Sequence, residues 1–299
     1  MATSRKTTKF LFDLAGAKAP LFYRGNNLEV KTANDVILAI DQGYEKDSRE
    51  KARKYIGASI IGNPCDAYIA FNLRGYPNNE PDPRLKRIFN LGHVLEDIVV
   101  NDLKKKGDIR VWEVDGLTGK QHTYELWGGH VVCHMDGHVE LDDGVVRVLE
   151  IKSMNDASFN KFKKSGVKFS HSSYYGQLQM MMGMSGFEES LFIAINKNNC
   201  EYHAEIVKYD DFEFAHIKER VERAVHGESA KISKDESDWR CRGCFKRGVC
   251  WGDTEVPVQC STCSFSSASP DGLWHCHKHD KSAVKACADY ERYAPADKE

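Results

Sequence analysis

Apolar residues recur every three or four positions in several segments, the spacing that places them on one face of a helix. The longest such segment runs from 84 to 106, with an apolar stripe at Leu85, Ile88, Leu95 and Val99, and Gly107 is a suitable stop. The same reading predicts shorter helices over 34–43, 68–74, 172–184 and 211–226.

Runs rich in Val, Ile and Leu alternate with these helices and predict strands over 129–141, 145–152, 191–196 and 202–209. The first two runs are separated by Asp142-Asp143-Gly144, which suits a type I turn closed by a glycine in the left-handed conformation. Such a loop pairs Leu141 with Val145. Continuing this ladder places Asp136 directly opposite Glu150.

The pattern changes near residue 228, where turns punctuated by cysteines and aromatic residues replace the periodic segments. Seven of the ten cysteines lie between 241 and 287. We therefore expect a lead-in over 1–55, an α/β core over 56–228, and two Cys-rich segments over 229–255 and 256–299.

The composition is that of a globular protein and excludes several classes. Hydrophobic residues make up 41% and charged residues 29%, which excludes wholesale disorder. The 42 Lys and Arg against 44 Asp and Glu leave a net charge of −2, which excludes a globally basic nucleic-acid wrapper but not a local basic groove. No apolar run approaches the roughly 20 residues needed to cross a bilayer, so we expect no membrane partner.

The start of the chain does not read as a secretory signal, because Asp13 interrupts its apolar stretch. In a chain without an export signal, ten cysteines indicate metal or cluster ligation rather than a disulfide framework. These features predict a cytoplasmic protein.

Two carboxylates and a lysine converge at the end of the strand predicted over 145–152. Alternate side chains of a strand share a face, so Glu150 and Lys152 emerge together beside Asp136. Like charges are costly to bury together unless a cation lies between them, and Mg²⁺ or Mn²⁺ takes such oxygen ligands. Lys152 would then orient or deprotonate a water, or balance charge on a phosphate. The alternative is an ordinary exposed Glu–Lys pair.

These residues, Asp136-Gly137 and then Glu150-Ile151-Lys152, resemble the core of the PD-(D/E)xK nuclease superfamily. Upstream, Gly92-His93-Val94-Leu95-Glu96 resembles the helical motif of its RecB-like and lambda-exonuclease-like branches. Downstream, Tyr174-Tyr175-Gly176-Gln177 resembles their last motif, in which a glutamine and a tyrosine border the active site.

The resemblance implies an α/β fold with a restriction-endonuclease-like core, a central mixed β-sheet flanked by helices, and a small Cys-rich metal-binding appendage. It implies catalytic roles for Glu96, Asp136, Glu150, Lys152 and Gln177. The first three would bind Mg²⁺ or Mn²⁺, with His93 as a further ligand one helical turn before Glu96.

The cysteines divide into two sets. Cys241, Cys244 and Cys250 supply three thiols where a tetrahedral site needs four, and Cys65 is the candidate for the fourth. This arrangement resembles iron–sulfur RecB-like nucleases, including the CRISPR-adaptation exonuclease family and related phage nucleases. The resemblance implies a structural [4Fe–4S] cluster that ties the two ends of the core together, and Zn²⁺ in the same thiols is the alternative.

The second set, Cys260, Cys263, Cys276 and Cys287, has the spacing of a small zinc ribbon. One of His275, His277 and His279 could replace a cysteine. A segment this short and poor in aliphatic residues needs a metal in order to fold. The remaining Cys133 and Cys200 lie in predicted strands and are expected to be small core residues.

Basic residues near these motifs are candidates for contacts with DNA phosphates. They are Lys161, Lys163, Lys164, Lys168, Arg242, Lys246 and Arg247, and the resemblance adds Tyr175. The alternative is that these charges belong to solvated surfaces.

Together these features predict a divalent-metal-dependent DNA nuclease, with exonuclease action on DNA ends in recombination, repair or phage DNA processing. A structure-specific or nicking endonuclease is one alternative, and a non-catalytic DNA-binding or assembly module on a nuclease fold is another. The expected partners are DNA, as double-stranded ends or single strands, and a recombination or replication protein. A phage-encoded chain would act in the host cytoplasm.

Overall fold

The computed structural model describes residues 30–47 and 52–297, and the chain forms two compact units that divide after residue 46. The first unit contains α1 (Ala33–Lys46), close to the helix predicted over 34–43. Thr32 and Asp35 begin α1 by exchanging hydrogen bonds between side chain and backbone, over 2.7 and 3.2 Å. The start of the chain around Asp13 lies outside the described residues.

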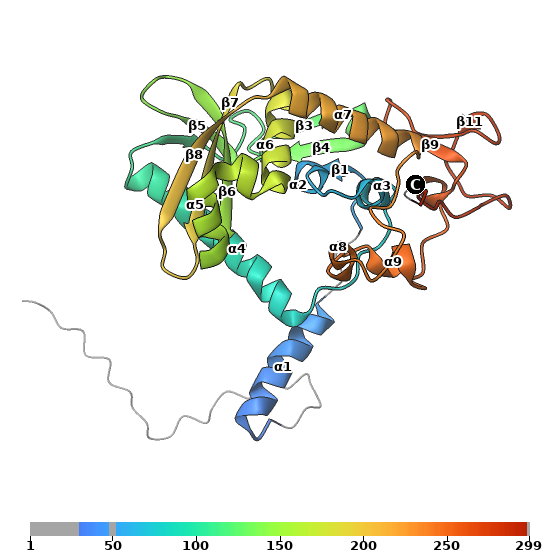
Figure 1. Ribbon diagram of the computed structural model, residues 1–299, viewed down its shortest axis with the longest axis horizontal. Coiled ribbons are helices and arrows are strands. Elements are labelled where there is room, and N and C mark those ends of the chain that lie inside the picture. Colours follow the sequence, from blue (N-terminus) through green and yellow to red (C-terminus); the bar gives the residue numbers. More distant parts are fainter. Residues whose placement is uncertain (1–29, 48–51, 298–299) are drawn as a thin grey trace, which may run out of the picture. The chain divides into compact units, whose positions relative to one another are not determined.

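A five-stranded mixed sheet forms the centre of the second unit (Figure 1). Its strand order is β2 (Arg110–Trp112), β5 (Gly137–Glu140), β6 (Val146–Met154), β7 (Glu189–Asn196) and β8 (Tyr202–Lys208). The β6–β7 pair is parallel and the other pairs are antiparallel. The expected central mixed sheet is therefore present.

Helices cover both faces of this sheet. On one face α4 (Pro83–Lys105) buries Leu95 and Val99 against Leu149 and Ile151 of β6. On the other face α5 (Asp156–Ser170), α6 (Ser172–Ser185) and α7 (Asp211–His226) form the larger core around Val148. Each fully buried aliphatic or aromatic side chain contributes roughly 1.5–3 kcal/mol to folding. These two cores fix the position of β6 between the layers.

The hairpin between β5 and β6 has the predicted register. Val139 lies opposite Arg147 and Gly137 opposite Leu149, so the same register continued by one residue sets Asp136 against Glu150. Gly144 closes the turn at φ +73°, the left-handed conformation predicted for it. Gly137 is required for packing, because a Cβ there would lie 2.8 Å from the carbonyl oxygen of Trp112 on β2.

The single strand predicted over 129–141 is wrong, because the chain leaves one sheet and enters another at Met135 and Asp136. The first half is β4 (Val131–His134), in a separate sheet between β1 (Ile56–Gly57) and β3 (Thr123–Leu126). The second half is β5. At the break, Asp136 uses its carboxylate rather than a backbone carbonyl to accept the amide hydrogen of Ile151.

The remaining helices mostly follow the predictions. Residues 66–73 form α3 (Asp66–Leu73), after the single turn α2 (Ala58–Ile61). The helix α5 was not predicted, and Gly166 interrupts it at φ +69°. Cys200 is not a core residue as expected, since it is exposed in the β7–β8 turn at φ +63°. Cys133 is fully buried in β4.

The Cys-rich end of the chain belongs to the same compact unit as the sheet. It contains short elements only: α8 (Trp239–Arg242), α9 (Arg247–Trp251), β9 (Ser266–Ala268), β10 (Trp274–Cys276) and β11 (Lys281–Ser282), with a 3-10 turn at Cys260–Thr262. Another 3-10 turn, Trp127–Gly129, lies between β3 and β4. Tyr76 links the Cys-rich end to the core, since its hydroxyl donates to the carbonyl of Tyr293 over 2.7 Å.

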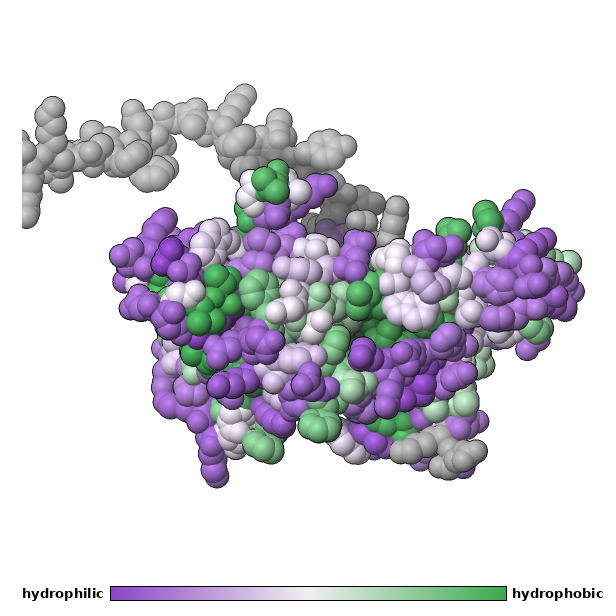
Figure 2. Space-filling view, turned by 90° about the horizontal axis from the view of Figure 1, so that it is seen from above, coloured by the Kyte–Doolittle hydropathy of each residue, from purple (hydrophilic) through white to green (hydrophobic). Residues whose placement is uncertain are grey.

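Hydrophilic residues cover most of the face shown in Figure 2, with hydrophobic residues in smaller areas between them. Within residues 30–47 and 52–297, no helix combines the length and the apolar character that a membrane crossing requires.

Candidate active site and thiol sites

Three carboxylates from different elements meet beside β6. Glu150 lies on β6, Asp136 directly precedes β5, and Glu96 lies on α4. The Oδ2 atom of Asp136 accepts a hydrogen bond from the Ile151 amide over 2.8 Å, which fixes this carboxylate against the strand. Glu96 is near enough to Asp136 for that charge to act on its pKa. The structure thus brings together the three carboxylates that the sequence singled out.

Glu150 is only 1% exposed, and its two oxygens differ in their surroundings. Its Oε1 accepts a hydrogen bond from Gln177 Nε2 over 2.7 Å and also contacts Lys152 Nζ. Its Oε2 is buried and has no hydrogen-bond partner among the described residues. A buried carboxylate oxygen without a partner is unfavourable unless a ligand reaches it.

The carboxylates perturb one another. Burial first, and then the negative charge of Asp136, raise the pKa of Glu96 to about 7 and that of Glu150 to about 8. A cation would relieve this repulsion. The oxygen-rich donor set and the free Oε2 therefore fit a hard divalent ion such as Mg²⁺ or Mn²⁺.

Lys152 is the cation of the site. Burial opposes its charge, but the nearby carboxylates Glu150 and Asp136 outweigh burial and raise the pKa of Lys152. Its Nζ lies 5.5 Å from the centre of the Tyr174 ring, which stacks on His171 with ring centroids 5.3 Å apart. His171 gave no signal in the sequence, because its position follows from the junction of two helices rather than from a motif.

The basic residues predicted to contact DNA have different environments. Lys161 and Lys164 are exposed on α5, whereas Lys163 pairs with Glu201, and Lys168 with Asp210 over 2.9 Å. Arg242 is exposed and donates to the carbonyl of Ser237, and Arg247 donates to the carbonyl of Glu236. His93 is exposed on α4, one turn before Glu96.

Two of the predicted DNA contacts are corrected by the structure. Lys246 is 1% exposed and donates from Nζ to the carbonyl of Tyr76 over 2.5 Å, so it faces the interior. Burial lowers the pKa of Lys246 to about 7. Tyr175 is 7% exposed, and its hydroxyl donates to Asp210 over 2.9 Å. Both side chains are occupied by contacts within the fold.

The first thiol set is brought together from distant parts of the chain. Cys65, Cys241, Cys244 and Cys250 all line one cavity of about 380 Å³. Burial first, and then the neighbouring sulfurs, raise the pKa of Cys250 to about 12. Burial also raises the pKa of Cys244. Thiols that crowd one cavity fit a metal that takes them as thiolates, and such a metal would lower the pKa values that burial raises.

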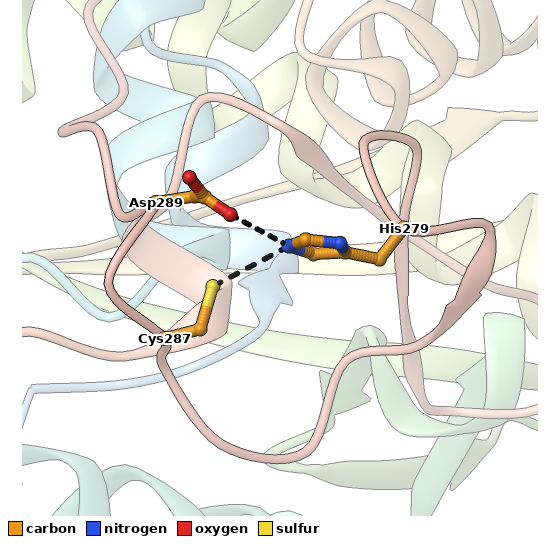
Figure 3. A group of neighbouring side chains, drawn as sticks. All are labelled: His279, Cys287 and Asp289. Carbon is orange, nitrogen blue, oxygen red and sulfur yellow. Dashed lines mark hydrogen bonds and ion pairs between the residues drawn. The ribbon is translucent and has the colours of Figure 1, made fainter.

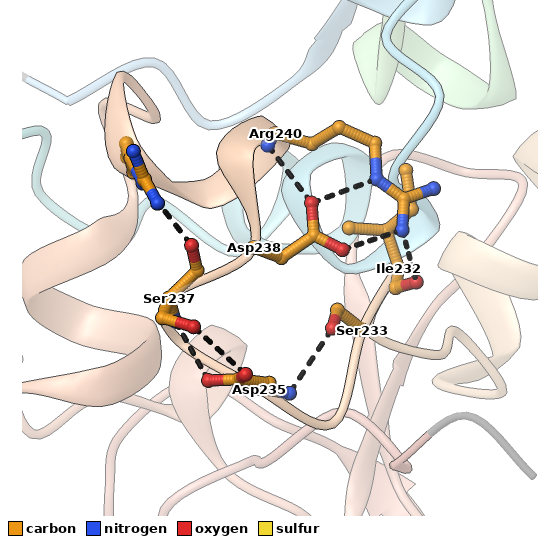
Figure 4. Close-up of polar contacts among 7 residues, drawn as sticks. Ile232, Ser233, Asp235, Ser237, Asp238 and Arg240 are labelled. Carbon is orange, nitrogen blue, oxygen red and sulfur yellow. Dashed lines mark hydrogen bonds and ion pairs between the residues drawn. The ribbon is translucent and has the colours of Figure 1, made fainter.

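The loop before Cys241 is held by its own polar side chains (Figure 4). Asp238 caps α8 by accepting from Arg240 N over 2.9 Å, and its other oxygen accepts from Arg240 Nη2 over 2.7 Å. Asp235 accepts from both the amide and the hydroxyl of Ser237, each over 2.8 Å. These contacts fix the path of the chain into Cys241.

The second thiol set also lines one cavity. Cys260, Cys263, Cys276 and Cys287 surround it together with His279. Burial first, then the other three sulfurs, raise the pKa of Cys260. His279 Nε2 lies 3.6 Å from the sulfur of Cys287 and 3.1 Å from Asp289 Oδ2 (Figure 3). Of the three histidines that the sequence left open, His279 is the one beside a thiol of this set.

The part of the chain that carries the carboxylates, Lys152 and Gln177 matches a known family. Residues 79–188 match the sequence model of the YqaJ-like viral recombinase domain. No curated protein is significantly similar to the chain in sequence.

Solved structures with a related arrangement include exonucleases. An alkaline exonuclease from Laribacter hongkongensis, LHK-Exo, is 19% identical, with a TM-score of 0.43 over 58% of this chain and 87% of that one. The same enzyme in complex with dAMP gives 18% identity and a TM-score of 0.41, over 57% and 86% of the two chains. A phage-related exonuclease from Haemophilus somnus 129PT is 14% identical, with a TM-score of 0.38 over 59% and 92%.

Proposed function

We propose that the chain is a divalent-metal-dependent DNA nuclease that hydrolyses phosphodiester bonds, and that it acts on DNA ends. The observation that carries this proposal is the buried Oε2 of Glu150, which has no hydrogen-bond partner within residues 30–47 and 52–297 and lies near Asp136, Glu96 and Lys152. Acidic oxygens that converge on one another and on an ammonium group form a site for a metal ion and a phosphate.

Glu150, Asp136 and Glu96 would hold Mg²⁺ or Mn²⁺. When bound, such an ion activates water and stabilises the leaving oxygen of a phosphodiester. Gln177 orients Glu150 through its hydrogen bond to Oε1, which leaves Oε2 for the metal side. His93 is assigned as a further ligand on the same helix as Glu96.

Burial opposes the charge of Lys152, but without a bound metal the carboxylates around it outweigh burial and raise its pKa. We assign Lys152 to hold a phosphate oxygen or the attacking water by a hydrogen bond from its ammonium group. Removal of this charge would leave the phosphate without its nearest protein cation.

DNA would approach over α5, where Lys161 and Lys164 are exposed just after the β6 strand that carries Glu150 and Lys152. Contacts of lysine with phosphate are independent of base sequence. The Arg242 and Arg247 side chains offer a second basic area next to the first thiol set. The match of 79–188 to a viral recombinase domain supports a role in recombination.

The two thiol sets would hold metals of different kinds. We assign a structural [4Fe–4S] cluster to Cys65, Cys241, Cys244 and Cys250, with Zn²⁺ as the alternative, and Zn²⁺ to Cys260, Cys263, Cys276 and Cys287. The convergence of each set on its own cavity supports these assignments.

Anaerobically purified full-length protein tests the activity on two substrates, end-labelled linear DNA and covalently closed circular DNA, with and without Mg²⁺ or Mn²⁺. We expect metal-dependent release of nucleotides from linear DNA and no cleavage of the circle. Glu150→Gln protein serves as the matched control. Cleavage of the circular DNA would show an endonuclease rather than an exonuclease. DNA binding without cleavage in the presence of either metal would refute the proposal that the protein is a nuclease.

A further inference from the structure

Arg74 is a fully buried cation whose hydrogen bonds all go to backbone carbonyls. It directly follows α3 and is 0% exposed. Its Nη1 donates to the carbonyls of Ser261 and Cys263 over 3.1 and 3.0 Å, and its Nη2 donates to the carbonyl of Ser266 over 2.8 Å. The guanidinium thus holds the turn that carries Cys260 and Cys263, two of the four cysteines of the second thiol set.

The buried charge has no carboxylate within ion-pair distance in the ranges 30–47 and 52–297. Its guanidinium carbon lies 3.8 Å from the centre of the Tyr293 ring and 5.2 Å from that of Trp274, and its Nε has no hydrogen-bond partner among the same residues. Carbonyls and rings offer partial negative charge only. A buried guanidinium without a full counter-charge is strongly destabilising.

Cys263 of the second thiol set is near enough to Arg74 for a thiolate charge there to act on the guanidinium. The carbonyls that Arg74 binds belong to Ser261, Cys263 and Ser266, within the segment that supplies Cys260 and Cys263. Protonated thiols are neutral, whereas Zn²⁺ with four thiolates has a net negative charge. The missing counter-charge therefore forms when this site is loaded.

We propose that Arg74 is the counter-ion and positioning residue of the second thiol set, so that zinc binding there is favoured by a cation that belongs to the core of the fold. The inference rests on the zinc assignment made above for Cys260, Cys263, Cys276 and Cys287. Arg74 does two things: it holds the carbonyls of Ser261, Cys263 and Ser266, and it supplies a positive charge near Cys263.

Zinc affinity of the full-length protein tests the proposal. Zinc is removed with a competing chelator, and the fraction that disappears in Cys263→Ser protein is assigned to this site. We expect Arg74→Met to weaken this zinc site by roughly tenfold or more, as loss of a supporting residue around a metal typically does. Arg74→Lys, which keeps the charge, should retain more affinity than Arg74→Met.

Arg147→Met is the matched control for general destabilisation. Arg147 on β6 is also buried, at 3% exposure, but it is paired with Asp143 of the β5–β6 turn and with Glu189 of β7. We expect it to lower the melting temperature while leaving zinc affinity unchanged. Equal zinc loss in the Arg147→Met and Arg74→Met proteins would overturn the proposal.

A double-mutant cycle with Cys276→His separates charge from scaffolding. The histidine removes one negative charge from the loaded site, so Cys276→His should lower zinc affinity less in an Arg74→Met background than in the wild-type background. Equal losses of zinc affinity in both backgrounds would show that Arg74 acts only by holding the turn and not as a counter-ion.

If Arg74→Met does not fold, the cycle is run with Arg74→Lys, which keeps the charge. The loss of zinc affinity caused by Cys276→His should then equal that in the wild-type background, and a smaller loss would overturn the proposal. Wild-type protein without zinc in this site would instead refute the zinc assignment itself.

Discussion

Gln177 of α6 donates to Oε1 of Glu150 on β6 over 2.7 Å, so a helix on one face of the sheet orients a carboxylate of the strand. Lys152 contacts the same oxygen. Both donors therefore bind the same oxygen, and the other oxygen, Oε2, has no partner in the part of the chain that the structure describes. The neutral amide of Gln177 orients the carboxyl group and leaves Oε2 to face a metal.

Glu150→Gln and Lys152→Ala should each reduce the cleavage rate by roughly a hundredfold or more. Glu150→Gln removes a metal ligand, and Lys152→Ala removes the ammonium group that holds the phosphate. Folding and DNA binding should change little, since Gln keeps the shape of Glu150. The measurement is nucleotide release from end-labelled DNA, together with thermal unfolding. Activity near that of the wild type in either variant would contradict the assignment of the site.

Gln177→Leu should lower the cleavage rate by about tenfold and raise the Mg²⁺ concentration needed for half-maximal activity. Loss of a residue that orients a metal ligand commonly has effects of this size. A Mg²⁺ titration of the cleavage rate checks this. Gln179→Leu is the comparison, because Gln179 is also buried on α6 but donates to the carbonyl of Lys208 and should leave the Mg²⁺ requirement unchanged.

The stability of the metal-free protein should fall as the pH rises from about 5 to 8. The folded-state pKa values of Glu96 and Glu150, about 7 and about 8, lie above the ordinary value of 4.5, so the folded state holds protons that the unfolded state has lost. This contribution to stability is fully present below pH 4.5 and is lost as the pH rises through 7 and 8.

Mg²⁺ binds the deprotonated carboxylates, so the increase in melting temperature on adding MgCl₂ should be larger at pH 8 than at pH 6. Glu150→Gln should reduce this difference, and Glu125→Gln, at an exposed acidic residue of β3, should not. An increase in melting temperature that is the same at both pH values would contradict the raised pKa values of Glu96 and Glu150.

The two thiol sets should lose their metals independently of each other when a cysteine is replaced. Cys244→Ser should remove iron and leave zinc, and Cys263→Ser should do the reverse, because each cysteine lines its own cavity. Elemental analysis of anaerobically purified protein measures both. Two zinc ions and no iron in the wild type, even after anaerobic reconstitution, would refute the cluster and leave the nuclease proposal intact.

Cys65→Ala should release the metal of the first set, lower the melting temperature and expose the C-terminal region to protease. A link between Cys65 and Cys241 closes a very long loop, and such closures contribute a few kcal/mol. Limited proteolysis and thermal unfolding measure the effect. Cys200→Ala, at an exposed turn, is the control. A nearly neutral Cys65→Ala would mean that Cys65 is only a small packing residue.

The sequence alone predicted the features that depend on neighbouring residues, such as turns, strand register and helix ends. The left-handed Gly144 sets the length of the β5–β6 turn, and the alternation of strands then fixes which residues face one another, including Asp136 and Glu150. The helix α7 ends at Gly227, which has φ +81° and caps it as a glycine typically does. Such rules need no knowledge of distant residues.

Features decided by distant contacts could not be predicted in this way. The pattern of apolar and polar residues over 129–141 is the same for one long strand as for two short ones. The two cases differ only because the chain passes at Asp136 from one sheet to another. Lys246 lies among exposed basic residues in sequence, and its burial depends on Tyr76, 170 residues away. The role of Arg74 follows from carbonyls that are nearly 190 residues distant.

The short buried helix α3 lies between the two thiol sets, with Cys65 as its N-terminal cap and Arg74 as its C-terminal cap. This has a consequence for the order in which the protein matures. The helix is synthesised before the residues that complete its two ends, Cys241 to Cys250 and Ser261 to Ser266. The core therefore stays open at α3 until these two segments have been synthesised, and a truncated product that ends after α7 cannot close it.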